Sequence, residues 1–293
     1  MSQQPKYKFF ATLLDSYRNM VESDNVWDTY WGYSENPPHT PEQFHVLQVE
    51  NFIDSLNRVS GVPIEAASKG TAFNELIDAI VEKRAPKVDN LNKVRDSSNN
   101  VVAIECGLDG FNFSFPYQTI RELADYYQDA IPQYRTQGVL QTRFGAVNLY
   151  GYIDELMPHS VHDIKTTGRY EFPKFSKHAQ HLVYPYCLSC EGSDIRHFQY
   201  DIVVWSKYGL PETYSEVYMF DPQRDTVVLR KWCEELISFL EQIRPLITDK
   251  QVFGGRKEDS PEPDFVCNAD TTGMPQLCID LVNDIRLLHK QLG

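Results

Sequence analysis

"GYIDELMPHSVHDIKTTGR", residues 151–169, decides the expected fold, because it joins two strand-like runs by a short turn and places charged residues on both. β-branched and aromatic residues fill the two runs, and Pro158 and His159 lie between them. This composition is typical of a β-hairpin. If Met157 pairs with Ser160 across the turn, Asp154 stands directly opposite Asp163 on the same face of the hairpin.

Two carboxylates in that position lie about 5 Å apart at their Cβ atoms and repel each other, unless a cation lies between them. Carboxylate and carbonyl oxygens favour Mg²⁺ or Mn²⁺ over zinc. We therefore predict a metal site formed by Asp154, Asp163 and the backbone carbonyl of Ile164. Lys165 lies on the same face, where it would orient or deprotonate an attacking water or hold charge that develops on phosphorus. The alternative is an ordinary hairpin whose charges are solvated, since the register is an assumption.

The flanking sequence predicts a mixed α/β domain with a partly antiparallel sheet. Residues 1–45 are aromatic-rich and are expected to be irregular. Thr40, Pro41 and Gln43 are typical of a capped helix start. Apolar periodicity predicts helices over 40–59, 71–84, 114–131 and 174–190, strands over 139–145, 147–156, 160–167, 195–206 and 212–220, and a strand that continues into a helix over 224–247. A loop is expected from 249 to 275, with a closing helix after it whose apolar stripe runs from Leu277 to Leu292.

The segments "GYID", "HDIKTT" and "QHLVY" together resemble the PD-(D/E)XK nuclease superfamily, in its RecB-like and lambda-exonuclease-like branch. The resemblance covers residues 68–240 and implies a restriction-endonuclease-like αβββαβ core. It assigns Asp154 to the aspartate of the second strand, and Asp163 with Lys165 to the D/E-x-K motif. Gln180 and Tyr184 match the Q-x-x-x-Y motif, and their spacing puts both on one helical face.

The first core helix departs from the family pattern, in which a histidine follows a conserved glycine by four positions. "GTAFNE" offers Gly70, Asn74 and Glu75 instead. Asn74 or Glu75 would supply a metal ligand, with Glu75 as a catalytic carboxylate on the helix, or both are solvated residues. The missing histidine affects the expected metal affinity or the number of ions bound.

The resemblance implies a metal-dependent nuclease that hydrolyses phosphodiester bonds, most readily a DNA exonuclease of phage or recombination and repair type. It also implies Mg²⁺ or Mn²⁺ as cofactor, DNA as partner, and, from phage-type relatives, a homo-oligomer and an annealing partner protein. Expected domains are an N-terminal helical extension (1–67), the nuclease core (68–248) and a C-terminal loop and helix (249–293). The alternatives are a non-catalytic nucleic-acid-binding or assembly subunit that kept the fold, and an unrelated enzyme with a chance hairpin.

Composition limits these classes further. A formal net charge of −13 argues against a protein that coats nucleic acid, although a local basic groove can still hold a strand. Apolar runs are far shorter than a membrane span, which predicts a cytoplasmic protein without a membrane partner. The residues expected to line a groove for nucleic acid are basic and lie near the motifs: Arg143, Arg169, Lys174 and Lys177.

The six cysteines suit reduced thiols. An iron–sulfur cluster of the kind held by some RecB-like relatives is not expected, because no cysteine precedes Cys106. A zinc site from His178, His181, Cys187 and Cys190 is disfavoured, since six helical residues separate His181 from Cys187, a rise of about 9 Å.

Overall fold

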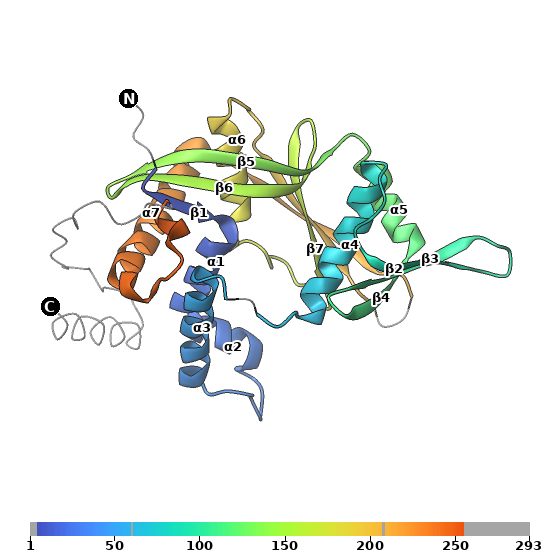
Figure 1. The fold of residues 1–293 in the computed structure, drawn as a ribbon, viewed down its shortest axis with the longest axis horizontal. Helices are drawn as coiled ribbons and strands as arrows, with labels where there is room; N and C mark the ends of the chain where they lie inside the picture. The colour runs from blue at the N-terminus through green and yellow to red at the C-terminus, as the bar shows by residue number, and fades with distance from the viewer. Residues whose placement is uncertain (1–4, 60, 207–208, 255–293) are drawn as a thin grey trace.

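The computed structural model describes residues 5–59, 61–206 and 209–254. A six-stranded mixed sheet forms the centre (Figure 1), with strand order β1, β6, β7, β8, β9 and with β5 also paired to β6. The strands of this sheet are β1 (Tyr7–Phe10), β5 (Ile131–Thr142), β6 (Gly145–Leu156), β7 (Ser160–Thr167), β8 (His197–Val204) and β9 (Glu212–Met219). Helices cover it, so the predicted mixed α/β fold with a central mixed sheet and N-terminal helices is confirmed.

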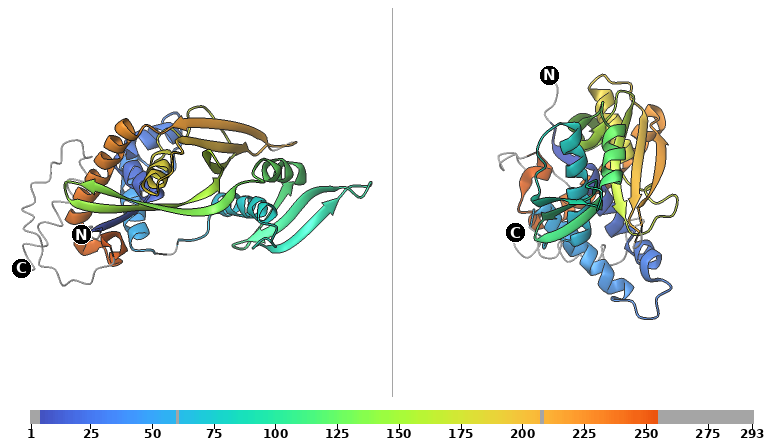
Figure 2. Two further views of the ribbon diagram at one scale, coloured as in Figure 1. Left: turned by 90° about the horizontal axis from the view of Figure 1, so that it is seen from above. Right: turned by 90° about the vertical axis from the view of Figure 1, so that its right-hand side faces the viewer.

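The predicted core order is also confirmed. α4 (Glu65–Val81) precedes β5, β6 and β7, and α6 (Gln180–Cys190) precedes β8, which gives αβββαβ. A smaller antiparallel sheet and a helix are inserted after α4. The inserted elements are β2 (Asp89–Arg95), β3 (Val101–Leu108), β4 (Phe111–Pro116) and α5 (Tyr117–Tyr126). Figure 2 shows this insertion extending from one end of the molecule.

Two strands, β1 and β7, pair with different parts of the same edge of β6. β1 runs parallel to Val147–Tyr150, whereas β7 pairs only with Glu155 and Leu156. Among the described strands, none pairs with residues 151–154 of β6 on this edge. The chain leaves the sheet after Phe10, where α1 (Ala11–Val21) begins. The sheet is therefore open beside Asp154, between the end of β1 and the start of the β7 pairing.

The hairpin register is confirmed where the strands pair. Glu155 pairs with His162 and Leu156 with Val161, and the N–H of Met157 donates to the carbonyl of Ser160 at 2.9 Å. The ladder ends one pair before Asp154 and Asp163, so the prediction that these two residues pair directly opposite each other was wrong. Ile164 instead donates its N–H to the Asp154 side chain at 3.0 Å. β7 continues as the parallel neighbour of β8.

The prediction that residues 1–45 are irregular was wrong. They form β1, α1 and α2 (Ser23–Trp31), and the buried side chains of α1 include Leu13, Leu14 and Tyr17. A strand of four residues is too short to show an alternating pattern, and the aromatic side chains of this segment serve the core rather than loops. α3 (Pro41–Leu56) was predicted correctly, and Thr40 and Gln43 form the expected capping box.

Further predictions need correction. The helix expected over 114–131 is shorter, since residues up to Pro116 belong to β4 and β5 begins at Ile131. The strand expected at the start of 224–247 does not form, because Asp221 caps a helix that begins at Pro222 and runs as α7 (Pro222–Gln242). Short 3₁₀ helices follow as η1 (Arg244–Leu246) and η2 (Lys250–Phe253). The inserted strands were missed, since β2 is exposed along almost its whole length and shows no period of two. The closing helix predicted from Leu277 to Leu292 lies outside the described residues.

Buried apolar side chains form two clusters on opposite faces of β7 and β8. Val161 and Ile202 belong to the cluster with α1, α6 and α7, whereas Ile164 and Val203 belong to the one with α4 and α5. The open part of the sheet thus has a helix on either side, α4 and α6. No helix in the described part of the chain is long and apolar enough to cross a membrane.

Candidate active site

Asp154 lies at the opening in the sheet and binds groups from two other elements. Its Oδ2 accepts the N–H of Ile164 from β7 at 3.0 Å and the Nδ2–H of Asn74 from α4 at 3.3 Å. These two contacts join the first core helix to the hairpin at the point where the strands separate.

Asp163 lies on the α6 face of β7 and is 1% exposed. Its Oδ2 is 2.6 Å from Nζ of Lys165, and its Oδ1 accepts a hydrogen bond from Nε2 of Gln180. The Lys165 ammonium also lies 5.7 Å from the centre of the Tyr200 ring. Asp163 is therefore fixed from both sides, by the lysine of its own strand and by the glutamine of α6.

Burial and the charges of neighbouring groups shift the pKa values in this cluster. Burial raises the pKa of Asp154 to about 8, and the charge of Asp163 adds to the effect. Burial also raises the pKa of Asp163, although Lys165 opposes this. For Lys165 itself, burial lowers the pKa, but the carboxylates of Asp163 and Asp154 outweigh it and the net shift is upward.

A glycine allows α6 to approach the hairpin closely. A Cβ atom on Gly151 would lie 2.4 Å from Cε1 of Tyr184, so the tyrosine ring rests directly on the backbone of β6. Nε2 of Gln180 lies 3.4 Å from the Tyr184 hydroxyl. Gly151 of the "GYID" segment thus seats the tyrosine of the Q-x-x-x-Y segment, and the tyrosine supports the glutamine that holds Asp163.

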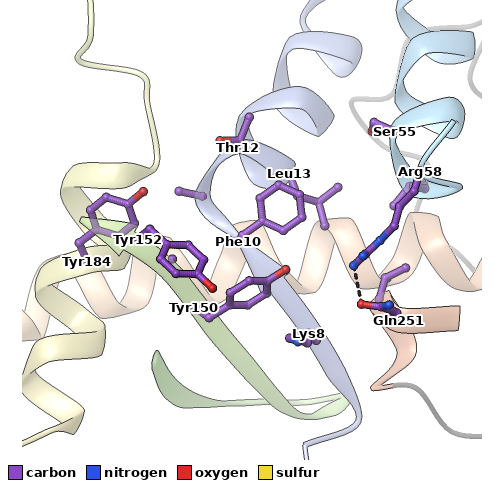
Figure 3. Close-up of a pocket in the computed structure, with 14 residues that line it drawn as sticks. Lys8, Phe10, Thr12, Leu13, Ser55, Arg58, Tyr150, Tyr152, Tyr184 and Gln251 are labelled. Atoms are coloured by element: carbon purple, nitrogen blue, oxygen red, sulfur yellow. Dashed lines mark hydrogen bonds between the residues drawn. The ribbon is translucent and has the colours of Figure 1, made fainter. Parts of the chain in front are cut away.

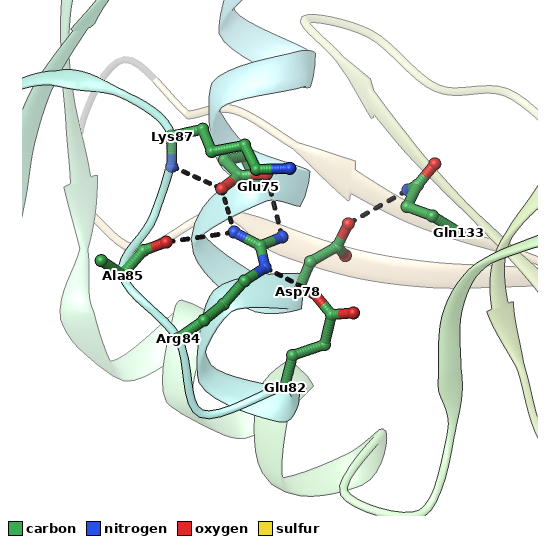
Figure 4. Close-up of polar contacts among 7 residues, drawn as sticks. All are labelled: Glu75, Asp78, Glu82, Arg84, Ala85, Lys87 and Gln133. Atoms are coloured by element: carbon green, nitrogen blue, oxygen red, sulfur yellow. Dashed lines mark hydrogen bonds and ion pairs between the residues drawn. The ribbon is translucent and has the colours of Figure 1, made fainter.

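The two candidates on α4 are separated by the structure. Asn74 reaches Asp154, whereas Glu75 is not brought to the cluster. The Glu75 carboxylate accepts hydrogen bonds from both terminal nitrogens of Arg84 and from the N–H of Lys87 (Figure 4). Arg84 holds the pKa of Glu75 below its usual range despite the partial burial of that carboxylate.

Sequence reasoning missed a second acidic pair beside Asp154. Asp78, one turn after Asn74 on α4, is 2% exposed, and Glu155 of β6 is fully buried. Burial raises the pKa of Glu155 to about 9, and the charge of Asp78 raises it further; burial raises the pKa of Asp78 to about 6. Gln133 donates to Asp78 at 3.1 Å (Figure 4). Glu155 directly follows the motif aspartate, which is the one signal that could have marked it.

A third missed residue is Asp15, which comes from the N-terminal helix α1. Its Oδ1 accepts the N–H of Ala179 at 2.7 Å, immediately before Gln180. Arg18 donates to the carbonyl of Lys177 at 2.8 Å, so α1 holds the segment that leads into α6. Burial raises the pKa of Asp15 to about 7, which Ala179 and nearby cations partly oppose. The N-terminal helix thereby sets the position of Gln180.

The four predicted nucleic-acid contacts differ in their surroundings. Lys174 donates from Nζ to Thr167 and to the carbonyl of Arg169, and the Arg169 side chain is 88% exposed. Lys177 forms an ion pair with Glu22 at 3.0 Å. Arg143 is not brought to the cluster, since it lies in the turn that leads into β6, about 30 Å along the strand from Asp154.

The residues at the opening suit a hard divalent ion such as Mg²⁺. Asp154, Asp163 and the carbonyl of Ile164 offer oxygen atoms, and Oδ1 of Asn74 is buried without a hydrogen-bond partner. In the described residues, no group of three or more His, Cys, Asp or Glu side chains is arranged to hold a metal ion. A site with two carboxylates matches Mg²⁺, which keeps several waters and uses few protein ligands.

Two of the four residues of the disfavoured zinc site lie in the interior. His181 stacks on Tyr218 with ring centres 4.4 Å apart, and Cys187 is buried. The cysteines within the described ranges are all free: Cys106, Cys187, Cys190 and Cys233. Cys267 and Cys278 lie outside the described residues.

Comparison with known proteins gives distant likeness of structure and none of sequence. No protein-family model matches the sequence, and no curated protein matches it either. A solved structure of an inferred exonuclease from Eubacterium rectale shares 11% identity with a TM-score of 0.40, over 87% of this chain and 96% of that one. The crystal structure of SSO0001 shares 12% identity with a TM-score of 0.31, over 43% of this chain, and the match spans 60% of its length.

Proposed function

We propose that the protein is a metal-dependent nuclease that hydrolyses phosphodiester bonds in DNA. One observation carries the proposal: Asp154 accepts the N–H of Ile164, the residue between Asp163 and Lys165, at an opening of the sheet. Asn74 reaches Asp154 from α4, and Gln180 reaches Asp163 from α6. Buried like charges are costly at such a place unless the site serves a cation or a reaction.

Asp154, Asp163 and the carbonyl of Ile164 would hold Mg²⁺ or Mn²⁺, and Asn74 would add a neutral oxygen after rotation of its amide. When bound, the ion supplies positive charge that offsets the charge of the phosphate and makes water a better nucleophile. Rotation of the amide would also give the buried Oδ1 of Asn74 a partner.

The protein's own groups would position the reacting atoms. Lys165 has donors free of Asp163, since an ammonium carries three. It would donate to a non-bridging phosphate oxygen or to the attacking water. As the water oxygen bonds to phosphorus, the bond from phosphorus to the leaving deoxyribose oxygen breaks. The water gives up one proton to solvent, and the leaving oxygen takes one proton from solvent. Gln180 and Tyr184 act on this step by fixing Asp163.

The competing account is a subunit of the same fold that binds nucleic acid without cleaving it. The test compares purified protein on linear duplex, circular duplex and single-stranded DNA and on RNA, with Mg²⁺, with Mn²⁺ and with a chelator. We expect metal-dependent degradation of DNA by the wild type and its loss in Asp163→Ala. Equal degradation by both proteins, or none on any substrate with either metal, contradicts the nuclease.

A further inference from the structure

The opening of the sheet continues into a pocket of about 440 Å³ next to the carboxylate cluster. It lies between β1, α1, the end of α3 and the middle of β6 (Figure 3). The side chains that define it are Lys8, Phe10, Arg58, Tyr150, Tyr152 and Tyr184. This volume is within the range of small-ligand sites.

The charge of the pocket is opposite to that of the chain. The full sequence carries a net charge of −13, yet the residues lining the pocket include Lys8 and Arg58 and no Asp or Glu. Lys8 places Nζ 4.7 Å from the centre of the Tyr150 ring. Arg58 is held by Asp249 at 3.0 Å and by Gln251 at 2.5 Å, so its guanidinium is oriented before a ligand arrives. An anionic group fits this lining.

Aromatic rings supply the second half of the lining. Tyr152 is 53% exposed, and Phe10 is 36% exposed with its ring centre 5.8 Å from that of Tyr150. Figure 3 shows the rings of Phe10, Tyr150 and Tyr152 gathered on one side, with Lys8 and Arg58 beyond them. Exposed aromatic rings beside cations are the combination that binds unpaired bases and their phosphates.

The pocket and the cluster share structural parts. Tyr184 lines the pocket, and its hydroxyl lies 3.4 Å from Nε2 of Gln180, which binds Asp163. Tyr152 precedes Asp154 by two residues, about 7 Å along the strand. If one unit of a linear ligand binds among the rings, the next unit of that ligand would therefore lie at the carboxylates.

From these relationships we infer that the pocket binds an unpaired nucleotide at the end of a DNA strand. The base stacks against Tyr150 and Tyr152, and Lys8 and Arg58 bind its phosphate. This inference rests on the proposed nuclease function for the identity of the ligand, and it names the part of the substrate that the site selects.

The test measures binding in a chelator, so that no hydrolysis is involved. The probes are a short single-stranded oligodeoxynucleotide, the same oligonucleotide with abasic residues at both ends, and a free deoxymononucleotide. Tyr152→Ala is compared with Tyr33→Ala, a fully exposed tyrosine outside the pocket. Lys8→Gln is compared with Lys231→Gln on α7, and thermal unfolding checks that each variant folds.

We expect Tyr152→Ala to weaken binding of the intact oligonucleotide about fivefold or more, which is the effect of losing one stacked base. The abasic probe should bind the wild type as weakly as the intact probe binds Tyr152→Ala. Lys8→Gln should reduce the slope of log affinity against log salt by about 0.7, as expected for one phosphate contact to a single strand. Tyr33→Ala and Lys231→Gln should match the wild type.

Equal binding of the intact and abasic probes, or equal effects of Tyr152→Ala and Tyr33→Ala, overturns the inference. Binding of the mononucleotide as tight as that of the oligonucleotide also overturns it, because the pocket would then serve a free nucleotide. If the proposed nuclease function is wrong but the inference about the pocket is right, the result differs: strand ends would bind through the pocket residues, but no metal would support cleavage.

Discussion

The backbone N–H of Ile164 donates to the side chain of Asp154 at 3.0 Å, where a carbonyl of β6 would accept it in a continued hairpin ladder. The aspartate thus ends the pairing that its own strand begins. Because the ladder stops there, the sheet opens beside Asp154, and both the carboxylate cluster and the aromatic pocket lie along that opening.

Replacement of Gly151 by alanine tests the contact that joins the hairpin to α6. The new methyl group would lie 2.4 Å from Cε1 of Tyr184, so the tyrosine must move and Gln180 with it. We expect the free energy of unfolding to fall by about 1–3 kcal/mol, which is typical of overpacking. We also expect the nuclease rate of the folded variant to fall, because Gln180 no longer fixes Asp163. Thermal unfolding and initial rates check this.

Gly168→Ala is the matched control, since a Cβ atom there meets nothing within 4 Å. If Gly151→Ala keeps the wild-type rate and stability, Tyr184 does not depend on close approach to β6.

Substitutions at Asn74 and Glu75 should affect metal binding differently, although the two residues are neighbours in sequence. Asn74→Ala removes a group that contacts Asp154, so the rise in unfolding temperature produced by Mn²⁺ should shrink and need about tenfold more metal. Glu75→Gln weakens the bond to Arg84 and lowers stability without metal, but it should leave the response to Mn²⁺ unchanged.

A metal titration followed by thermal unfolding separates the two variants. A weaker Mn²⁺ response in Glu75→Gln than in Asn74→Ala would place the helix ligand at Glu75 instead.

The raised pKa of Asp15 should make the stability of the protein depend on pH. Its pKa is raised to about 7 in the folded protein, mainly by burial, from an ordinary value of 3.8. The folded state therefore holds the proton more tightly than the unfolded state does. The contribution of protonated Asp15 to the free energy of unfolding is complete below pH 4 and is lost as the pH rises through about 7. Asp15→Asn, which keeps an oxygen for the N–H of Ala179, should gain stability relative to wild type between pH 5 and pH 8.

Denaturant unfolding at the two pH values measures this difference, with the exposed Asp28→Asn on α2 as control. A difference between Asp15→Asn and wild type that does not grow from pH 5 to pH 8 contradicts the assignment.

The sequence was most informative where chemistry and local pattern coincide. The hairpin register follows from the turn at Pro158 and His159 and from alternation around it, and the structure has that register at Glu155 and Leu156 but not at Asp154. The point where the pairing of β6 with β7 ends could not be predicted, since the Asp154 side chain takes the place of a backbone carbonyl as acceptor for the N–H of Ile164. Asn74 and Glu75 are equally plausible ligands in sequence, and only the position of Arg84 in space separates them.

The N-terminal contributions were beyond prediction for a related reason. Asp15 and Lys8 act across more than a hundred residues of chain, on α6 and on β6. Their segments have no motif, and the four residues of β1 show no readable period. The pocket arises because β1 ends at Phe10 while β6 continues, a relationship between two strands that neither strand's sequence contains.

The most direct measurement of the central claim is the rate of Mg²⁺-dependent phosphodiester hydrolysis in wild type, Asp163→Asn and Asp28→Asn under identical conditions. Asp163→Asn keeps the shape of the side chain and removes the charge that Lys165 and the metal would meet. The nuclease account predicts a fall of about a hundredfold or more in Asp163→Asn and no change in Asp28→Asn. A wild-type rate in folded Asp163→Asn, with hydrolysis that does not need a divalent ion, would contradict it.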